Sequence, residues 1–313
     1  MTSPFSREFP RRGSWRLAGL LPASCAALFL SASCNTPQGP AGNQTGAGAA
    51  NRTAVYSHSD PTYTRSLRQD RSFTPETYVF KEGGYSGGPR RDRTQDQLTF
   101  DDISRVVGGT LATQNYLPSD DPPTTSLLIV VYWGTTVVPD DVVPHSARPS
   151  VTLSEQASTL IAQAKLGDAA SGIEAKSLQG QAAANADSES IMDGRINAKN
   201  ANLLGYTDEI LRVSPRDPYL HTLQDELEHD RYYVVLLAYD YQLGRKTGQR
   251  KLLWETRYSI PETGSDFGAC FPEMTAIAAQ YFGQDSHGLI HHNLANTHIE
   301  VGEPTSLGPV PAK

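Results

Sequence analysis

One short run, residues 126–133, constrains the fold of this chain more than any other feature. Its sequence, Ser-Leu-Leu-Ile-Val-Val-Tyr-Trp, is almost continuously apolar and is rich in β-branched and aromatic residues. This composition is typical of a β-strand that is covered on both faces. Because such a run is too apolar to be exposed to water, other elements of the chain must cover it.

A strand and a helix are predicted just before this run. Residues 77–82, which end at a glycine pair, are predicted to form the strand. Thr99, with Asp102 three residues later, has the pattern of a helix N-cap. Apolar residues then repeat at helical spacing on one face: Phe100, Ile103, Val107 and Leu111. Strand, helix and buried strand in this order predict a βαβ unit.

A second pair of strands is predicted at residues 232–241 and 251–260. In the later run apolar and polar residues alternate, which indicates an antiparallel hairpin with one wetter face. Residues 266–282 carry apolar side chains at helical spacing, and Gly283 follows where a helix C-terminus favours glycine. Cys270 lies on the apolar face of this helix, so we expect a buried, inert thiol.

Residues 139–230 interrupt this pattern and are rich in Ala, Gln, Asn, Glu and Lys. Their sparse apolar residues favour a helical insertion that packs against the core, or partly projects from it, over a separate domain. The predicted fold class is α+β, with a four-stranded mixed sheet and two amphipathic helices on one face. The insertion lies between the second and third strands. We expect this αβ domain to cover residues 73–283, and a polar tail to follow at 284–313.

The N-terminal residues have the layout of a bacterial export signal. Four arginines precede the uncharged run 17–33, which contains small residues and stops at Cys34. A basic region, a short apolar region and small residues before a cysteine predict a signal peptide at residues 1–33. The alternatives are a secretory peptide that is cut elsewhere and an ordinary membrane anchor. Residues 34–72, rich in Gly, Ala, Asn, Thr and Pro, are predicted to be a flexible tether.

The segment Leu30-Ser31-Ala32-Ser33-Cys34 resembles the lipobox of bacterial lipoproteins, with Ser31 where an aliphatic residue is usual. This resemblance implies that Cys34 takes a diacylglycerol and carries acyl chains such as palmitate. The elements at about 73–133 and 231–283 resemble those of uncharacterised envelope lipoproteins with a small periplasmic αβ domain similar to the TolB amino-terminal domain. The resemblance implies a membrane-anchored protein that faces the periplasm and acts by binding or scaffolding. Asn35, in place of aspartate, gives a mild preference for the outer membrane.

The net charge and the cysteine content limit the classes of partner that the chain can bind and the disulfides that it can form. The formal net charge is −7, and removal of the basic signal leaves the remainder more acidic still. Nucleic-acid binding needs clustered Lys and Arg, so we expect no nucleic-acid partner. Loss of Cys25 with the signal and lipidation of Cys34 would leave Cys270 without a disulfide partner, and the core alone must then stabilise the fold.

The sharpest enzymatic pattern is residues 84–88, Gly-Tyr-Ser-Gly-Gly, which match the G-x-S-x-G nucleophile elbow of serine hydrolases. An elbow needs a helix that starts at the serine, here Ser86, and the following Gly-Gly-Pro is a poor helix start. The motif is also short enough to arise by chance. We therefore expect no catalytic activity, and a hydrolase using Ser86 remains an alternative.

Histidines provide the other candidate chemistry. Four lie within twelve residues of the C-terminal segment: His287, His291, His292 and His298. His287 and His291 would share a face if this segment were helical, and such clusters can bind zinc or copper. A polar tail is the preferred interpretation, and no cofactor is expected. Acidic residues and histidines at 221–229, Glu226 and His229 among them, are interpreted as a solvated acidic helix.

Overall fold

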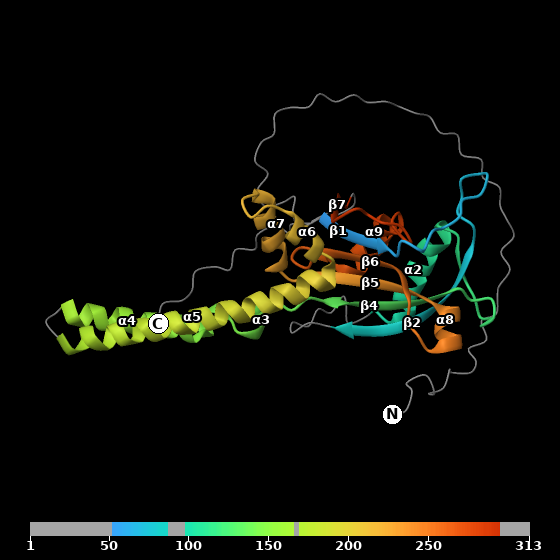
Figure 1. The fold of residues 1–313 in the computed structure, drawn as a ribbon. Helices are drawn as coiled ribbons and strands as arrows, with labels where there is room; N and C mark the ends of the chain where they lie inside the picture. Colours follow the sequence, from blue (N-terminus) through green and yellow to red (C-terminus); the bar gives the residue numbers. More distant parts are fainter. Residues whose placement is uncertain (1–51, 87–97, 166–168, 295–313) are drawn as a thin grey trace, which may run out of the picture. The chain divides into compact units, whose positions relative to one another are not determined.

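A computed structural model gives the chain an α+β fold (Figure 1) and describes residues 52–86, 98–165 and 169–294. Within these ranges a mixed sheet of seven strands has the order β3-β2-β4-β5-β6-β1-β7. The strands are β1 (Arg52–Ser59), β2 (Glu76–Ser86), β3 (Tyr116–Pro118), β4 (Leu127–Thr135), β5 (Arg231–Asp240), β6 (Leu252–Pro261) and β7 (Ile290–Asn293). The helices are α2 (Phe100–Thr113), α3 (Pro139–Val142), the 3-10 helix η1 (His145–Ala147), α4 (Pro149–Lys165), α5 (Ala169–Leu204), α6 (Thr207–Arg212), α7 (Pro218–Leu227), α8 (Tyr241–Thr247) and α9 (Phe267–Ala279).

Strand β4 lies inside the sheet, as its apolar sequence predicts. It pairs with β2 in the parallel sense on one side and with β5 in the antiparallel sense on the other. Ile129 and Val131 are fully buried in the main core, and Val130, which points to the opposite face, is also buried. Both faces of the strand are therefore covered, and the prediction from residues 126–133 is confirmed.

Helices α2 and α9 pack on the same face of the sheet, where the main hydrophobic core lies. The N-terminus of α2 is fixed by a capping box in which Thr99 and Asp102 exchange hydrogen bonds. The apolar stripe of α2 and the aromatic residues of α9 meet the inward side chains of the sheet, Trp254 and Tyr258 among them. The prediction that these two helices share one face is confirmed.

The insertion between β4 and β5 covers part of the other face. Here the end of α5 and helix α7 pack against β5, and the contact forms a second apolar cluster. Its buried members include Leu204, Leu223 and Leu227 from the helices and Tyr233 and Val235 from β5. The insertion thus contributes to the core of the domain as well as extending beyond it.

The sheet is wider than the four strands that the sequence predicts. Residues 52–59, placed in the flexible tether, form β1 between β6 and β7, so that prediction is wrong for this segment. Val55, the one large aliphatic residue in this run, is fully buried, and the other buried side chains are small, such as Thr53 and Ala54. Its stability comes from backbone pairing with strands about 200 residues later, which no local pattern can reveal.

The polar tail is also shorter than predicted. Residues 290–293 form β7 at one edge of the sheet, paired with β1, so the polar-tail prediction is wrong for them, whereas residues 295–313 lie outside the described ranges. At the other edge the three-residue strand β3 pairs with the start of β2. Between the two strands of the predicted hairpin, residues 241–247 form α8, which the Asp240 side chain caps by accepting from the Leu243 N–H.

A glycine ends the longest helix. Within the predicted helical insertion, α5 stops at Leu204, and Gly205, the next residue, has a φ of +81°. A Cβ atom added at Gly205 would lie 2.5 Å from the Cβ of Tyr56 on β1. The break therefore combines a left-handed conformation with close approach to the sheet, both of which favour glycine.

Helices α4 and α5 pack along each other as a hairpin, which Figure 1 shows in green and yellow. Its buried seam consists of small residues, including Ala157 on α4 and Ala175 and Ala182 on α5. Near its base, Arg148 lies 2.6 Å from Asp193 and binds α5. No helix of the described ranges has both the length and the apolar composition needed to cross a bilayer.

Candidate functional site

The C-terminal histidines do not assemble into one site. His291 and His292 are neighbours in β7, so their side chains point to opposite faces of the sheet. His287 lies before the strand with a φ of +58°, and His298 lies outside the described residues. The prediction that His287 and His291 could share a helical face is therefore wrong, because the segment is extended.

Each of these histidines has a different partner. His291 Nε2 lies 3.1 Å from Glu226 Oε2, and His292 Nε2 lies 3.4 Å from the Tyr281 hydroxyl. His287 Nδ1 lies 3.5 Å from Asp285. In the part of the chain that the structure describes, no three or more His, Cys, Asp or Glu side chains are grouped as a metal site.

The contact of His291 leads to a polar cluster that the sequence did not indicate. Glu226, on α7, accepts hydrogen bonds from Tyr206 and His291 and lies 3.6 Å from the guanidinium of Arg231. Arg231 is almost fully buried, and its Nε donates to the Ser259 hydroxyl at 3.1 Å. These residues come from α7, β5, β6, β7 and the junction of α5 and α6, so the cluster ties the insertion to the sheet.

Burial and charge act in opposite directions on Glu226. Burial alone would raise the pKa of its carboxyl, but the hydrogen bond with His291, the charge of Arg231 and the Tyr206 hydroxyl together lower it to about 2. Burial raises the pKa of Tyr206 well above its ordinary value. The carboxylate therefore stays ionised and the phenol stays neutral near neutral pH. The interpretation of residues 221–229 as a solvated acidic helix is wrong for Glu226, although Glu228, two residues later, is exposed.

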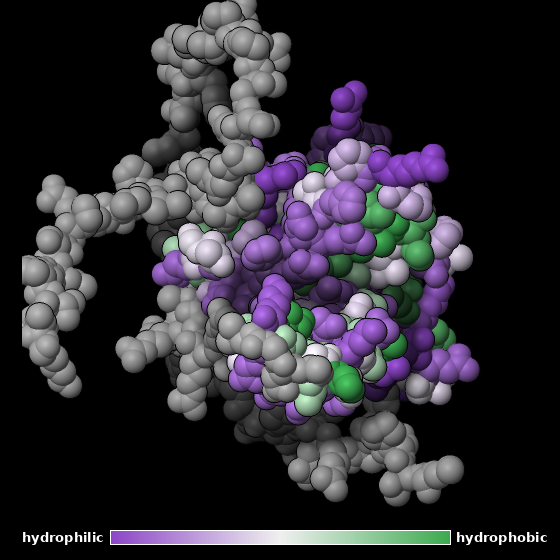
Figure 2. Space-filling view, turned by 90° about the vertical axis from the view of Figure 1, so that its left-hand side faces the viewer, coloured by the Kyte–Doolittle hydropathy of each residue, from purple (hydrophilic) through white to green (hydrophobic). Residues whose placement is uncertain are grey.

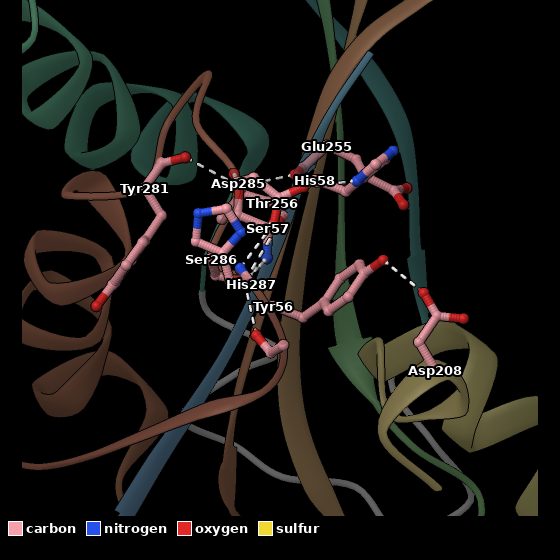
Figure 3. Close-up of polar contacts among 11 residues, drawn as sticks. Tyr56, Ser57, His58, Asp208, Glu255, Thr256, Tyr281, Asp285, Ser286 and His287 are labelled. Atoms are coloured by element: carbon pink, nitrogen blue, oxygen red, sulfur yellow. Dashed lines mark hydrogen bonds and ion pairs between the residues drawn. The ribbon is translucent and has the colours of Figure 1, made fainter. Parts of the chain in front are cut away.

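A second cluster lies where β1 meets the segment before β7 (Figure 3). The Ser57 hydroxyl lies 2.7 Å from that of Thr256 on β6 and within hydrogen-bond distance of the carbonyl oxygens of Glu255 and Tyr281. Ser286 donates its backbone N–H to the Ser57 carbonyl and accepts the Ser57 N–H on its hydroxyl, both at 2.9 Å. These bonds satisfy buried polar groups and fix the chain that leads into β7.

This second cluster contains the residue types of a serine hydrolase without their geometry. His58 Nδ1 lies 2.9 Å from Asp285, which resembles the base and acid of a triad. Ser57 and His58 are adjacent in a strand, however, and their side chains point to opposite faces, with Ser57 buried and His58 exposed. The imidazole therefore cannot take the proton of the Ser57 hydroxyl.

Tyr56, which directly precedes Ser57 in β1, points away from Ser57 toward α6 (Figure 3). Its hydroxyl donates to Asp208 at 3.0 Å. Burial first, and then the hydrogen bond to Asp208, raises the pKa of Tyr56 to about 12. This contact is a second connection between the sheet and the insertion.

The structure places Ser86 at the end of β2, opposite Gly134 of β4. The serine is thus part of a strand pair, whereas an elbow puts the serine on a strand-to-helix turn. The Ser86 hydroxyl forms a hydrogen bond with the side chain of Tyr233. Burial raises the pKa of Tyr233 more than this hydrogen bond lowers it. The residues that follow, 87–97, lie outside the described ranges, as does Cys34.

On the side of the molecule seen in Figure 2, hydrophobic areas lie among hydrophilic residues of the described chain. Cys270 is buried, as its position on the apolar face of α9 predicts, and burial raises the pKa of its thiol.

Comparison with known proteins gives no family. No protein-family model matches the chain, and no curated protein matches it. Among solved structures, a PDZ domain protein from Parabacteroides distasonis is 11% identical, and the alignment covers 78% of this chain at a TM-score of 0.33. The alignment spans 39% of that protein's own chain. A similarity at this level carries no argument about function.

Proposed function

We propose that this chain is a lipid-anchored protein of the bacterial cell envelope that faces the periplasm and binds a protein partner or has a structural role. The observation that carries the proposal is the N-terminal pattern, in which four arginines and the uncharged run 17–33 precede Cys34. Cleavage before this cysteine and addition of acyl chains to its thiol would attach the αβ domain to a membrane. Asn35 in the second mature position favours the outer membrane.

Two features of the fold support a binding or structural role. The polar side chains that come together around Glu226 and Ser57 bond to one another and hold strands and helices in place. The 36-residue helix α5 leaves most of its surface exposed, which makes a long side available to a partner. The alternatives, a hydrolase using Ser86 and a metal-binding protein using the C-terminal histidines, receive no such support from the described contacts.

Metabolic labelling with palmitate tests the anchor. In cells that express the full chain, we expect the wild type to incorporate label and to sediment with membranes, and Cys34→Ala to lose both properties. The change in fractionation should be large, because two or more acyl chains anchor a protein stably where one chain gives only marginal binding.

Cys25→Ala is the matched control, since Cys25 lies within the apolar run and should leave labelling intact. Persistent labelling of Cys34→Ala would show that another residue is modified. An unlabelled wild type would refute the lipoprotein proposal and favour a cleaved secretory signal or an ordinary membrane anchor.

A further inference from the structure

The face of α5 that points away from α4 carries apolar and small residues without a partner in the described part of the chain. Ile173 and Ile191 are 76% and 59% exposed, which is unusual for isoleucine in a helix of a soluble domain. They are eighteen residues apart, or five full turns of an α-helix, so they lie on one line along α5. Ala182, midway between them, is buried on the opposite side, against α4.

Small residues fill the same line between and beyond the two isoleucines. Gly180 and Ala184 lie between them and Ala198 lies past Ile191, and all three are exposed. A Cβ atom added at Gly180 would meet nothing within 4 Å, so no contact in the described residues requires a glycine there. Glycine is a poor helix former, and its use in the middle of a long helix is explained if a second helix approaches closely at this point.

We propose that this face is a self-association surface, on which α5 of one copy packs antiparallel against α5 of a second copy. The spacing is self-complementary about a two-fold axis near position 182. In that register Ile173 of one copy contacts Ile191 of the other, and Gly180 contacts Ala184. The same residues thus serve both copies, as an isologous interface requires.

Charge selects the antiparallel arrangement. Lys176 and Asp187 flank the line on the same side of α5, and in the proposed register each lies next to the opposite charge of the second copy. A parallel pairing, with the two-fold axis along the helices, would instead place this flank of one copy beside the opposite flank of the other, so Lys176 and Asp187 would not meet. The opposite charges are therefore paired in the antiparallel register and not in the parallel one.

The contact is long but narrow. The segment from Ile173 to Ile191 spans about 27 Å of helix at 1.5 Å per residue. A single pair of helices of this length buries less than the roughly 1,600 Å² of a standard stable interface. Association is therefore expected to be reversible and to depend on concentration, and it does not require the lipid anchor.

Sedimentation equilibrium of the full chain, purified in a density-matched non-ionic detergent, tests the proposal over roughly 1–100 μM protein. We expect a monomer–dimer equilibrium for the wild type. Ile173→Glu and Ile191→Glu should each weaken dimerisation by about tenfold or more, because each places a charge in the apolar contact. Both positions are exposed in the monomer, so far-ultraviolet circular dichroism should be unchanged.

The double variant Ile173→Lys/Ile191→Glu tests the register. In the antiparallel pairing it forms two lysine–glutamate contacts and should restore dimerisation, whereas a parallel pairing would oppose like charges. Leu211→Glu is the matched control, since Leu211 is 79% exposed on α6, away from this face, and should leave the equilibrium unchanged.

Three results would overturn the proposal. One is a monomeric wild type at every concentration, which would leave the face to a different partner. The second is dimerisation that persists in both glutamate variants, as sharing of a detergent micelle would produce. The third is failure of the double variant to recover, which would exclude the antiparallel register.

Discussion

The carboxylate of Glu226 provides the sharpest test of how the insertion is held to the sheet. Glu226→Gln keeps the size of the side chain but removes the negative charge that faces Arg231, which is almost fully buried. The ordinary pKa of 4.5 falls to about 2 in the folded protein, and each pKa unit corresponds to about 1.4 kcal/mol, so the ionised carboxylate stabilises the fold by about 3 kcal/mol. Removal of one partner of a buried ion pair costs a similar amount, about 3–5 kcal/mol.

This stabilisation has a defined pH dependence. Because the folded-state pKa lies below the unfolded-state value, the contribution of Glu226 is fully present above about pH 4.5 and is lost as the pH falls toward 2. We therefore expect wild type and Glu226→Gln to differ by about 3 kcal/mol in free energy of unfolding at pH 7. The difference should shrink steadily between pH 5 and pH 2.

Urea unfolding, followed by the fluorescence of the buried Trp133 and Trp254, measures both effects. Glu228→Gln is the matched control, because Glu228, two residues after Glu226 at the C-terminal end of α7, is exposed and should change the stability by less than about 0.5 kcal/mol. A loss below about 1 kcal/mol at pH 7, or a difference that does not vary with pH, would refute the assignment of Glu226 as a buried ionised anchor.

Two further predictions concern single positions. Gly205→Ala should destabilise the protein by about 1–3 kcal/mol in the same assay, because Gly205 has a φ of +81° and a Cβ there would overlap Tyr56. Gly248→Ala is the control: Gly248 has a φ of +76° with open space around it, so this variant measures the cost of backbone strain without overlap. Cys270 should react with a thiol reagent such as dithionitrobenzoate only after denaturant is added, since it is buried and its thiol pKa is raised. The measurement uses the variant Cys25→Ala/Cys34→Ala, in which Cys270 is the one remaining thiol. Rapid reaction of this native protein would contradict the prediction.

The main core was predictable because its elements have strong local patterns. Residues 126–133 are apolar throughout, and the stripe Ile103, Val107 and Leu111 has helical spacing after a capping box. Such patterns depend on which side chains must leave water, and this preference does not depend on the partners that cover them. The class of the fold and the shared face of α2 and α9 followed from them.

The outer strands and the polar clusters were not predictable in this way. β1 is a strand because β6 and β7 supply its hydrogen-bond partners, and nothing within Arg52–Ser59 marks it as one. In the sequence, Glu226 is one of several acidic residues in a polar helix. In the folded chain its carboxylate contacts Arg231, Tyr206 and His291 and holds the insertion to the sheet. Each of these partners comes from a different element of the fold, so no local spacing connects them.

By itself, the amino-acid sequence determined the central strand and the two amphipathic helices that cover it, and it contains the pattern on which the proposed export signal rests. The strand and the helices depend on hydrophobicity and helix capping, which act over a few residues. The tertiary structure alone decided the width of the sheet, the end of α5 at Gly205 and the pairing of Glu226 with Arg231. The physical reason is that backbone pairing, close approach and burial of charge depend on which distant segments meet, and only the folded chain brings those segments together.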